Sequence, residues 1–235
     1  MTSDPKFIFG NSYAIFFPAS SQNVFSHNVA FQIVLSANHD ISIVDEHKNE
    51  YSGRVILIKP LVKNKIKCDG QVTHLYLSPR RLSIALDLEN FVGEENIHVL
   101  KNAERLPFKA TDSRDEIIVA LDELDKSSFE RLDSRLLAVL EDLNQNLDNP
   151  SILNAAKRCG LSRSRIRTLA REQIGIPLST WVMWRKLVKA NKALSCGANL
   201  SDAALAGHFA DQAHFNRTMK RMFGVTPTEA SRVYT

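Results

Sequence analysis

Two helix-turn-helix patterns follow one another in the last third of the chain, and they constrain its fold more than any other feature. The second pattern covers residues 200–227, where the apolar residues have a spacing that suits two short helices packed together. Ser201 and Asp211 are predicted to cap these two helices, and residues 207–210 are short enough to form the turn. The sequence therefore predicts a compact helical unit here.

The same arrangement occurs upstream, over residues 151–175. Ser151 and Ser162 are predicted to cap the two helices, and Gly160 supplies a residue that adopts positive φ readily at a tight turn. Residues 179–197, between the two patterns, carry tryptophan and aliphatic side chains at helical spacing and predict a connecting helix. A helix of roughly fifteen residues is about 22 Å long, which could hold the two units near the ~34 Å repeat of the major groove.

The second helix of each pattern leaves a polar, largely basic face outward. Gln, Asn and Arg side chains can each make two hydrogen bonds to a base edge, and Lys or Arg can neutralise phosphates. The alternative for either helix alone is an ordinary solvated face. Two similar units in one chain are less easily explained by chance, so the pattern predicts DNA binding.

Residues from about 133 to 232 resemble the DNA-binding domain of AraC/XylS-type transcription regulators. The stretches that carry the resemblance are GLSRSRIRTLAREQIG and HFADQAHFNRTMKRMFGVTP. The resemblance implies a seven-helix domain whose third and sixth helices enter adjacent major grooves. One position departs from the family pattern, because His208 stands where the family usually has Gly. This departure predicts a distorted second turn or a non-glycine residue at positive φ.

Carried over position by position, the resemblance implies contacts to bases and to phosphates. The predicted base contacts are Ser164, Arg167 and Thr168 in the first unit and Gln212, His214, Asn216 and Arg217 in the second. The predicted phosphate contacts are Arg163, Arg165 and Lys220.

The charge of the chain divides in the same way. Residues 131–235 contain 16 Lys and Arg against 8 Asp and Glu, a net charge of +8, whereas residues 1–130 have a net charge of −4. A cationic module of this kind is expected to be steered toward phosphate and to bind DNA less tightly as salt rises.

The N-terminal half has a different pattern, with short runs rich in Ile, Val and Phe. The runs AFQIVLSA, DISIV, RVILIKP, VTHLYLSP and LSIALDL predict strands, and the turn-like pieces between them suit an antiparallel sandwich or small barrel. Residues 115–125 have helical spacing instead. The predicted fold class is α+β with two domains: a β-rich domain over residues 1–130 that ends in a helix, and an all-α domain over residues 131–235.

Regulators of the AraC/XylS family commonly carry a cupin-like β-domain that senses a small molecule or dimerises. Residues 51–66 resemble the strand-turn-strand of such a domain, although Asn64 stands close to where the family often has a histidine. By the same analogy, the helix over residues 117–124 is a candidate dimer contact. Packing of that helix on its own sheet is the equal alternative.

A metal-dependent cupin-like enzyme, or a small-ligand binding protein with an accessory nucleic-acid-binding half, is the alternative function. His27, His39, His47 and His74 are scattered without a His-x-His pair, so we expect no metal and no other cofactor. The three cysteines lie at wide spacing, which indicates neither a disulfide framework nor a zinc site. No stretch approaches the ~18 apolar residues of a membrane span.

The sequence thus predicts a bacterial-type transcription regulator in the cytoplasm, associated with the nucleoid when bound, rather than an enzyme or a membrane protein. Its expected partner is double-stranded promoter DNA. Contact with RNA polymerase, a small-molecule effector and a homodimer are further expectations. The sequence leaves open the operator, the effector and whether the protein activates or represses.

Overall fold

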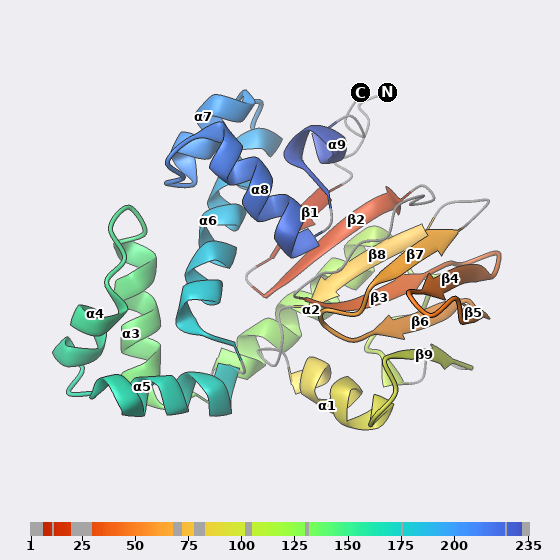
Figure 1. The fold of residues 1–235 in the computed structure, drawn as a ribbon, viewed down its shortest axis with the longest axis horizontal. Helices are drawn as coiled ribbons and strands as arrows, with labels where there is room; N and C mark the ends of the chain where they lie inside the picture. The colour runs from red at the N-terminus through yellow and green to blue at the C-terminus, as the bar shows by residue number, and fades with distance from the viewer. Residues whose placement is uncertain are drawn as a thin grey trace.

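The strands lie in the N-terminal half of the molecule together with two helices, and helices make up the C-terminal half (Figure 1). The structure, a computed structural model, describes residues 7–10, 12–19, 30–67, 72–77, 83–101, 105–129, 132–174, 176–223 and 225–231. This architecture confirms the predicted α+β class, with an antiparallel β-rich domain followed by a helical one. The predicted boundary between residues 130 and 131 lies outside the described residues and stays a prediction.

The β-rich domain contains two antiparallel sheets. The larger sheet has the strand order β1 (Phe7–Phe9), β2 (Tyr13–Ala19), β8 (Val72–Leu77), β3 (Phe31–Leu35), β6 (Val55–Ile58) and β9 (Ile97–Leu100). The smaller sheet has the order β5 (Glu50–Gly53), β4 (Ile41–Asp45) and β7 (Asn64–Lys67). In the part of the chain that the structure describes, the larger sheet ends at β1 and β9, so it forms no closed barrel.

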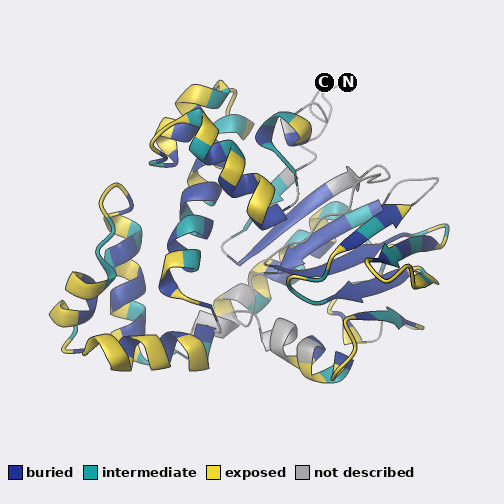
Figure 2. Cartoon of the chain, in the orientation of Figure 1, coloured by how far each residue is buried: buried dark blue, intermediate teal, exposed yellow. Residues whose placement is uncertain are grey.

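The central strands of the larger sheet are buried on both faces, as their dark colour in Figure 2 shows. Successive strand residues point to opposite faces, and accordingly Ile33 and Leu75 enter one hydrophobic cluster while Val34 and Tyr76 enter another. The first cluster is covered by α1 (Ser83–Val92) and α2 (Arg114–Phe129). Burial on both faces explains why these strands appear in the sequence as nearly continuous apolar runs.

The prediction of a strand for LSIALDL was wrong, because residues 83–92 form helix α1. Leu88 and Val92 are four residues apart, so they share one helical face, and both are buried in the cluster beneath the larger sheet. A short apolar run is compatible with either period. Here packing on the sheet favoured the helix.

The strands predicted within residues 51–66 exist, but they do not form one strand-turn-strand pair. Strand β6 pairs with β3 and β9 in the larger sheet, whereas β7 pairs with β4 in the smaller one. The chain therefore crosses from one sheet to the other after Ile58.

Helix α2 confirms the helix predicted over residues 115–125. Ile117 and Leu121 are buried in the cluster beneath the larger sheet, so this face of the helix packs on its own domain. This packing agrees with the alternative given for the helix, which is contact with its own sheet rather than with a second copy of the chain. The opposite face carries Val119, which is 57% exposed.

The helical domain contains seven α-helices, as the family resemblance implied, in the described part of residues 132–231. They are α3 (Ser134–Gln145), α4 (Ile152–Arg158), α5 (Arg163–Leu169), α6 (Leu178–Ser195), α7 (Leu200–Ala206), α8 (Gln212–Phe223) and α9 (Pro227–Ser231). A π-helical turn, η2 (Ala170–Ile174), continues α5. Helix α6 has 18 residues and is therefore about 27 Å long, somewhat longer than predicted.

Candidate nucleic-acid interface

Helices α4 and α5 form the first helix-turn-helix unit, and the predicted turn chemistry is present. Ser151 Oγ accepts a hydrogen bond from Asn154 N at 3.4 Å, and Ser162 Oγ accepts one from Arg165 N at 3.2 Å. Gly160 in the turn has φ +67°, which a residue without Cβ adopts at little cost. Ile166 and Leu169 on α5 are buried against α3, α4 and the start of α6.

Helices α7 and α8 form the second unit, with one correction to the predicted caps. Asn199, not Ser201, caps α7: its Oδ1 accepts hydrogen bonds from Ser201 N and Asp202 N. Both residues are good caps, and the helix begins two residues earlier than a cap at Ser201 would require. Asp211 caps α8 as predicted and accepts a hydrogen bond from His214 N at 2.5 Å.

The turn of the second unit contains the departure noted in the sequence. His208 has φ +55°, so a non-glycine residue occupies the left-handed region, as predicted. Its carbonyl oxygen accepts a hydrogen bond from Lys186 Nζ at 2.8 Å. Burial lowers the pKa of Lys186, whose side chain reaches the turn from α6. The neighbouring position, Gly207, favours glycine for a different reason: a Cβ there would lie 2.8 Å from the Lys186 carbonyl oxygen.

Replacing His208 by glycine is expected to raise the free energy of unfolding by about 1 kcal/mol, because the left-handed conformation costs an ordinary residue about that much. Denaturant unfolding of the full chain measures the effect. Gly160→Ala is the reciprocal control: its turn has open space around the added Cβ, so the expected loss of about 1 kcal/mol is conformational alone. A destabilised H208G protein would show that the imidazole contributes more than its backbone costs.

All five site residues predicted on the first unit are exposed on one helix. Arg163, Ser164, Arg165, Arg167 and Thr168 lie on α5 with their side chains at the surface, as the exposed colouring of α5 in Figure 2 shows. Ser164 Oγ lies 3.1 Å from Ser162 Oγ, next to the helix cap. The predicted contacts of this unit are therefore accessible together.

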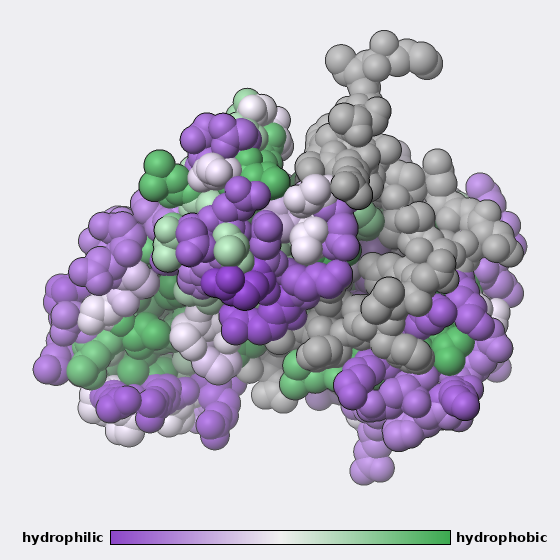
Figure 3. Space-filling view, turned by 45° about the horizontal axis from the view of Figure 1, so that its top comes forward, coloured by the Kyte–Doolittle hydropathy of each residue, from purple (hydrophilic) through white to green (hydrophobic). Residues whose placement is uncertain are grey.

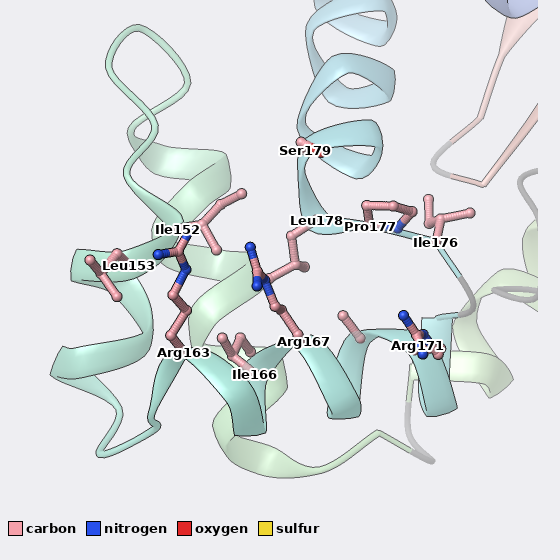
Figure 4. A pocket seen from close by; sticks show the side chains of 11 residues that line it. Ile152, Leu153, Arg163, Ile166, Arg167, Arg171, Ile176, Pro177, Leu178 and Ser179 are labelled. Atoms are coloured by element: carbon pink, nitrogen blue, oxygen red, sulfur yellow. The ribbon is translucent and has the colours of Figure 1, made fainter.

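A groove runs along α5 and was not predicted. It has a volume of about 570 Å³ and is bordered by three arginines at four-residue spacing, Arg163, Arg167 and Arg171. In Figure 4 Arg163 and Arg167 extend from α5 toward Ile152 on α4 and Leu178 on α6. Guanidinium groups suit phosphate, and apolar side chains such as these can contact thymine methyl groups. Arg171 thus joins the candidate interface, and its spacing from Arg163 and Arg167 was the signal in the sequence.

The second unit presents a more mixed surface on α8. Arg217 and Lys220 are exposed, whereas Gln212, His214 and Asn216 are half-buried. Gln212 Oε1 accepts a hydrogen bond from Ser201 Oγ at 3.2 Å, and the His214 ring meets Phe209 edge-on at 5.3 Å. Gln212 and His214 are therefore already engaged within their own unit.

Two of the predicted contacts on α8 have particular surroundings. Asn216 Oδ1 is buried and has no hydrogen-bond partner among the described residues. Lys220 Nζ donates to Glu229 Oε2 on α9 at 3.3 Å, and that carboxylate also accepts from Thr226 N at 2.6 Å. A phosphate at Lys220 would therefore share the ammonium group with Glu229.

On the face shown in Figure 3, hydrophilic surface covers most of the helical domain and is broken by apolar patches. Leu205 on α7 is 73% exposed, and Leu153 on α4 is 42% exposed. Cys196 is also exposed at the end of α6, whereas Cys159 is half-buried. Cys68 and His27 lie outside the described residues.

The other histidines that were considered as possible metal ligands lie in different parts of the β-rich domain. His74 is buried within β8, while His39 and His47 lie in the connections before and after β4. Within the described ranges, no group of three or more His, Cys, Asp or Glu side chains is placed to hold a metal ion. No helix in the part of the chain that the structure describes is both long and apolar enough to cross a membrane.

Known proteins resemble this chain in its helical part and in its overall fold. Residues 155–232 match the family model described as a helix-turn-helix domain. A putative HTH-type transcriptional regulator from Escherichia coli, YkgA, is 35% identical over 96 residues, which cover 40% of this chain and 40% of that protein. The sequence match thus spans less than half the length of this relative.

The whole chain is similar in fold to ToxT from Vibrio cholerae. A 1.65 Å structure of ToxT has a TM-score of 0.52 at 11% identity, covering 94% of this chain and 98% of ToxT. ToxT from strain SCE256 with a bound unsaturated fatty acid has a TM-score of 0.52 at 12% identity, covering 94% of this chain and 95% of that one. The match to the family model, together with the motifs on α5 and α8, shows a helix-turn-helix domain over residues 155–232 of this chain.

Proposed function

We propose that this protein is a sequence-specific DNA-binding transcription regulator that reads two adjacent major-groove segments, one with α5 and one with α8. The observation that carries the proposal is the pair of helix-turn-helix units at the two ends of α6, each with polar side chains on its second helix (Figure 1). The net charge of +8 over residues 131–235 supports attraction to phosphate. We do not propose an enzyme, because the matched family model describes a helix-turn-helix domain and the curated relative is named a transcriptional regulator.

Selection of bound sequences from a random DNA pool with the full-length protein, at one stated salt concentration, tests this function. We expect a motif with base preferences in two patches about one helical turn, ~34 Å, apart. A single patch would mean that only one unit reads bases. Failure to enrich any motif would remove sequence-specific regulation as the function.

Arg217→Ala is expected to cost about 1–3 kcal/mol of binding free energy at the selected site and to relax base preference there, as for an arginine that reads a base. Binding titrations on the selected site and on random DNA measure both effects. Arg165→Ala is the matched control, since this exposed arginine is predicted to contact a phosphate and should weaken binding about equally on both DNAs. Equal losses for R217A on the two DNAs would make Arg217 a phosphate contact.

We also propose that a small effector modulates DNA binding through the β-rich domain. The ToxT structures with an unsaturated fatty acid and with a naphthalenyl butenoic acid support this, because they pair this fold with small apolar carboxylates. Titration of an unsaturated fatty acid into the full-length protein, read by its melting temperature and by DNA affinity, tests the idea. An unchanged melting temperature and affinity would rule out this ligand class. The homodimer and the contact with RNA polymerase stay predictions.

A further inference from the structure

The carboxyl end of α8 is held by aromatic side chains from the β-rich domain. Phe223, the last residue of α8, is fully buried, and its ring meets Phe9 of β1 at 5.2 Å, Tyr76 of β8 at 5.3 Å and Trp184 of α6 at 5.3 Å. All three pairs are edge-on, an arrangement that aromatic rings favour. One hydrophobic cluster therefore includes the sheet and the second helix-turn-helix unit.

A buried hydrogen-bond chain reinforces this contact. Tyr76 Oη donates to the Phe223 carbonyl oxygen at 3.0 Å and lies 3.2 Å from His74 Nδ1. His74 Nε2 lies 2.9 Å from Gln32 Oε1 on β3, and the His74 and Tyr76 rings stack at 4.3 Å. Gln32, His74 and Tyr76 are each fully buried, so the chain runs through the sheet to the backbone of α8 without contact with solvent.

The direction of the donors in this chain is fixed by the number of protons available. A tyrosine hydroxyl that donates to the Phe223 carbonyl can only accept from His74, so Nδ1 carries the proton of a neutral ring and Nε2 is the acceptor. The structure has Gln32 Oε1 toward Nε2, so this proton pattern requires the other of the two amide orientations, with the NH2 group of Gln32 toward Nε2. In this arrangement every link of the chain has one donor and one acceptor.

The first helix-turn-helix unit has no part in this cluster. Helix α5 packs with α3, α4 and the first turns of α6 in a separate cluster that includes Ile166, Leu169 and Trp181. Helix α6 joins the two clusters, since Trp181 lies in one and Trp184 in the other. The β-rich domain therefore contacts α8 directly, whereas among the described residues of these two clusters it is α6 that links it to α5.

We propose that Tyr76 is a positioning residue that sets the place of α8 relative to α5 and thereby the DNA spacing that the protein prefers. The proposal rests on the proposed function. Two reading helices on one rigid frame select both the bases and the distance between them. Losing the hydrogen bond from Tyr76 to the end of α8 frees the helix to shift along the sheet face, so DNA segments at other spacings become acceptable.

Tyr76→Phe in the full-length protein tests the proposal, because it removes the hydroxyl and keeps the ring packed against Phe223. The probe is a set of duplexes that carry the selected motif with its two patches at the selected spacing, or one base pair nearer or farther. We expect the preference for the selected spacing to fall at least about threefold, while affinity for a duplex with the α5 patch alone stays unchanged. The preference is a ratio within one sample, so a lower folded fraction does not alter it.

Tyr13→Phe is the matched control. Tyr13 is also a buried tyrosine of the larger sheet, but it lies in the cluster on the opposite face and donates to Asp122 Oδ1 at 2.7 Å. This variant should keep the spacing preference of the natural protein. Equal preferences in the natural protein, Y76F and Y13F would overturn the positioning role and leave the proposed function standing. A natural protein that prefers no site at all would overturn the proposed function instead.

Discussion

Replacing Phe215 by alanine is expected to lower the free energy of unfolding by about 3–5 kcal/mol, as for other buried phenylalanines. Phe215 is fully buried on α8, with its ring 5.2 Å from that of Phe209 at the turn of the second unit. Truncation leaves a cavity in the cluster that joins this unit to the sheet, so both should lose stability together. Denaturant unfolding followed by far-UV circular dichroism measures the loss.

Leu205→Ala is the control for Phe215→Ala, because Leu205 belongs to the same unit but is 73% exposed. We expect it to change stability by less than about 0.5 kcal/mol. A small effect of F215A, similar to that of L205A, would mean that α8 does not pack as the structure describes.

Acidification from pH 6.5 to 4 is expected to remove about 3 kcal/mol of stability through His74 alone. Burial lowers the pKa of His74 from 6.5 to about 3. Below pH 6.5 the unfolded chain therefore binds a proton that the folded chain does not, and the free energy of unfolding falls by about 1.4 kcal/mol per pH unit. The loss ends when the pH reaches the folded-state pKa, because both states then carry the proton.

His74→Gln provides the comparison, since glutamine has no charge at any of these pH values. We expect H74Q to be less stable than the natural protein at pH 7, because the new glutamine side chain fits less well than the imidazole between Gln32 and Tyr76. Its stability should nevertheless change less between pH 6.5 and 4. Unfolding midpoints measured across this range would contradict the expectation if the two proteins lost stability in parallel.

The helical domain could be predicted from the sequence because its signals are local. Ser151, Ser162 and Asp211 stand at helix starts, and Gly160 stands at a turn. In each case the residue type itself indicates the local structure. The exception, Asn199 in place of Ser201, arose because two good caps lie two residues apart and α7 begins after the first of them. The exposure of the α5 site residues followed from the same helical spacing.

The sequence predicted that the N-terminal domain is β-rich, but it did not predict which strands pair with one another. Strand pairing depends on contacts between distant residues, so nothing near residues 51–66 showed that β6 and β7 belong to different sheets. For the same reason the contact of Tyr76 with Phe223 was invisible in the sequence. An apolar residue on a strand shows that something covers it, but it does not show whether that cover is a sheet or a helix of the other domain.

The shared cluster of the larger sheet and α8 limits which domains can be exchanged between this protein and other regulators. Phe9 and Tyr76 come from the first half of the chain, and Trp184 and Phe223 come from the second, so each half completes the interior of the other. A chimaera that joins this β-rich domain to the DNA-binding domain of another regulator would bring together faces that do not match. If α5 and α8 read DNA as proposed, DNA specificity would be exchanged between such proteins by grafting the exposed residues of these two helices, not by swapping whole domains.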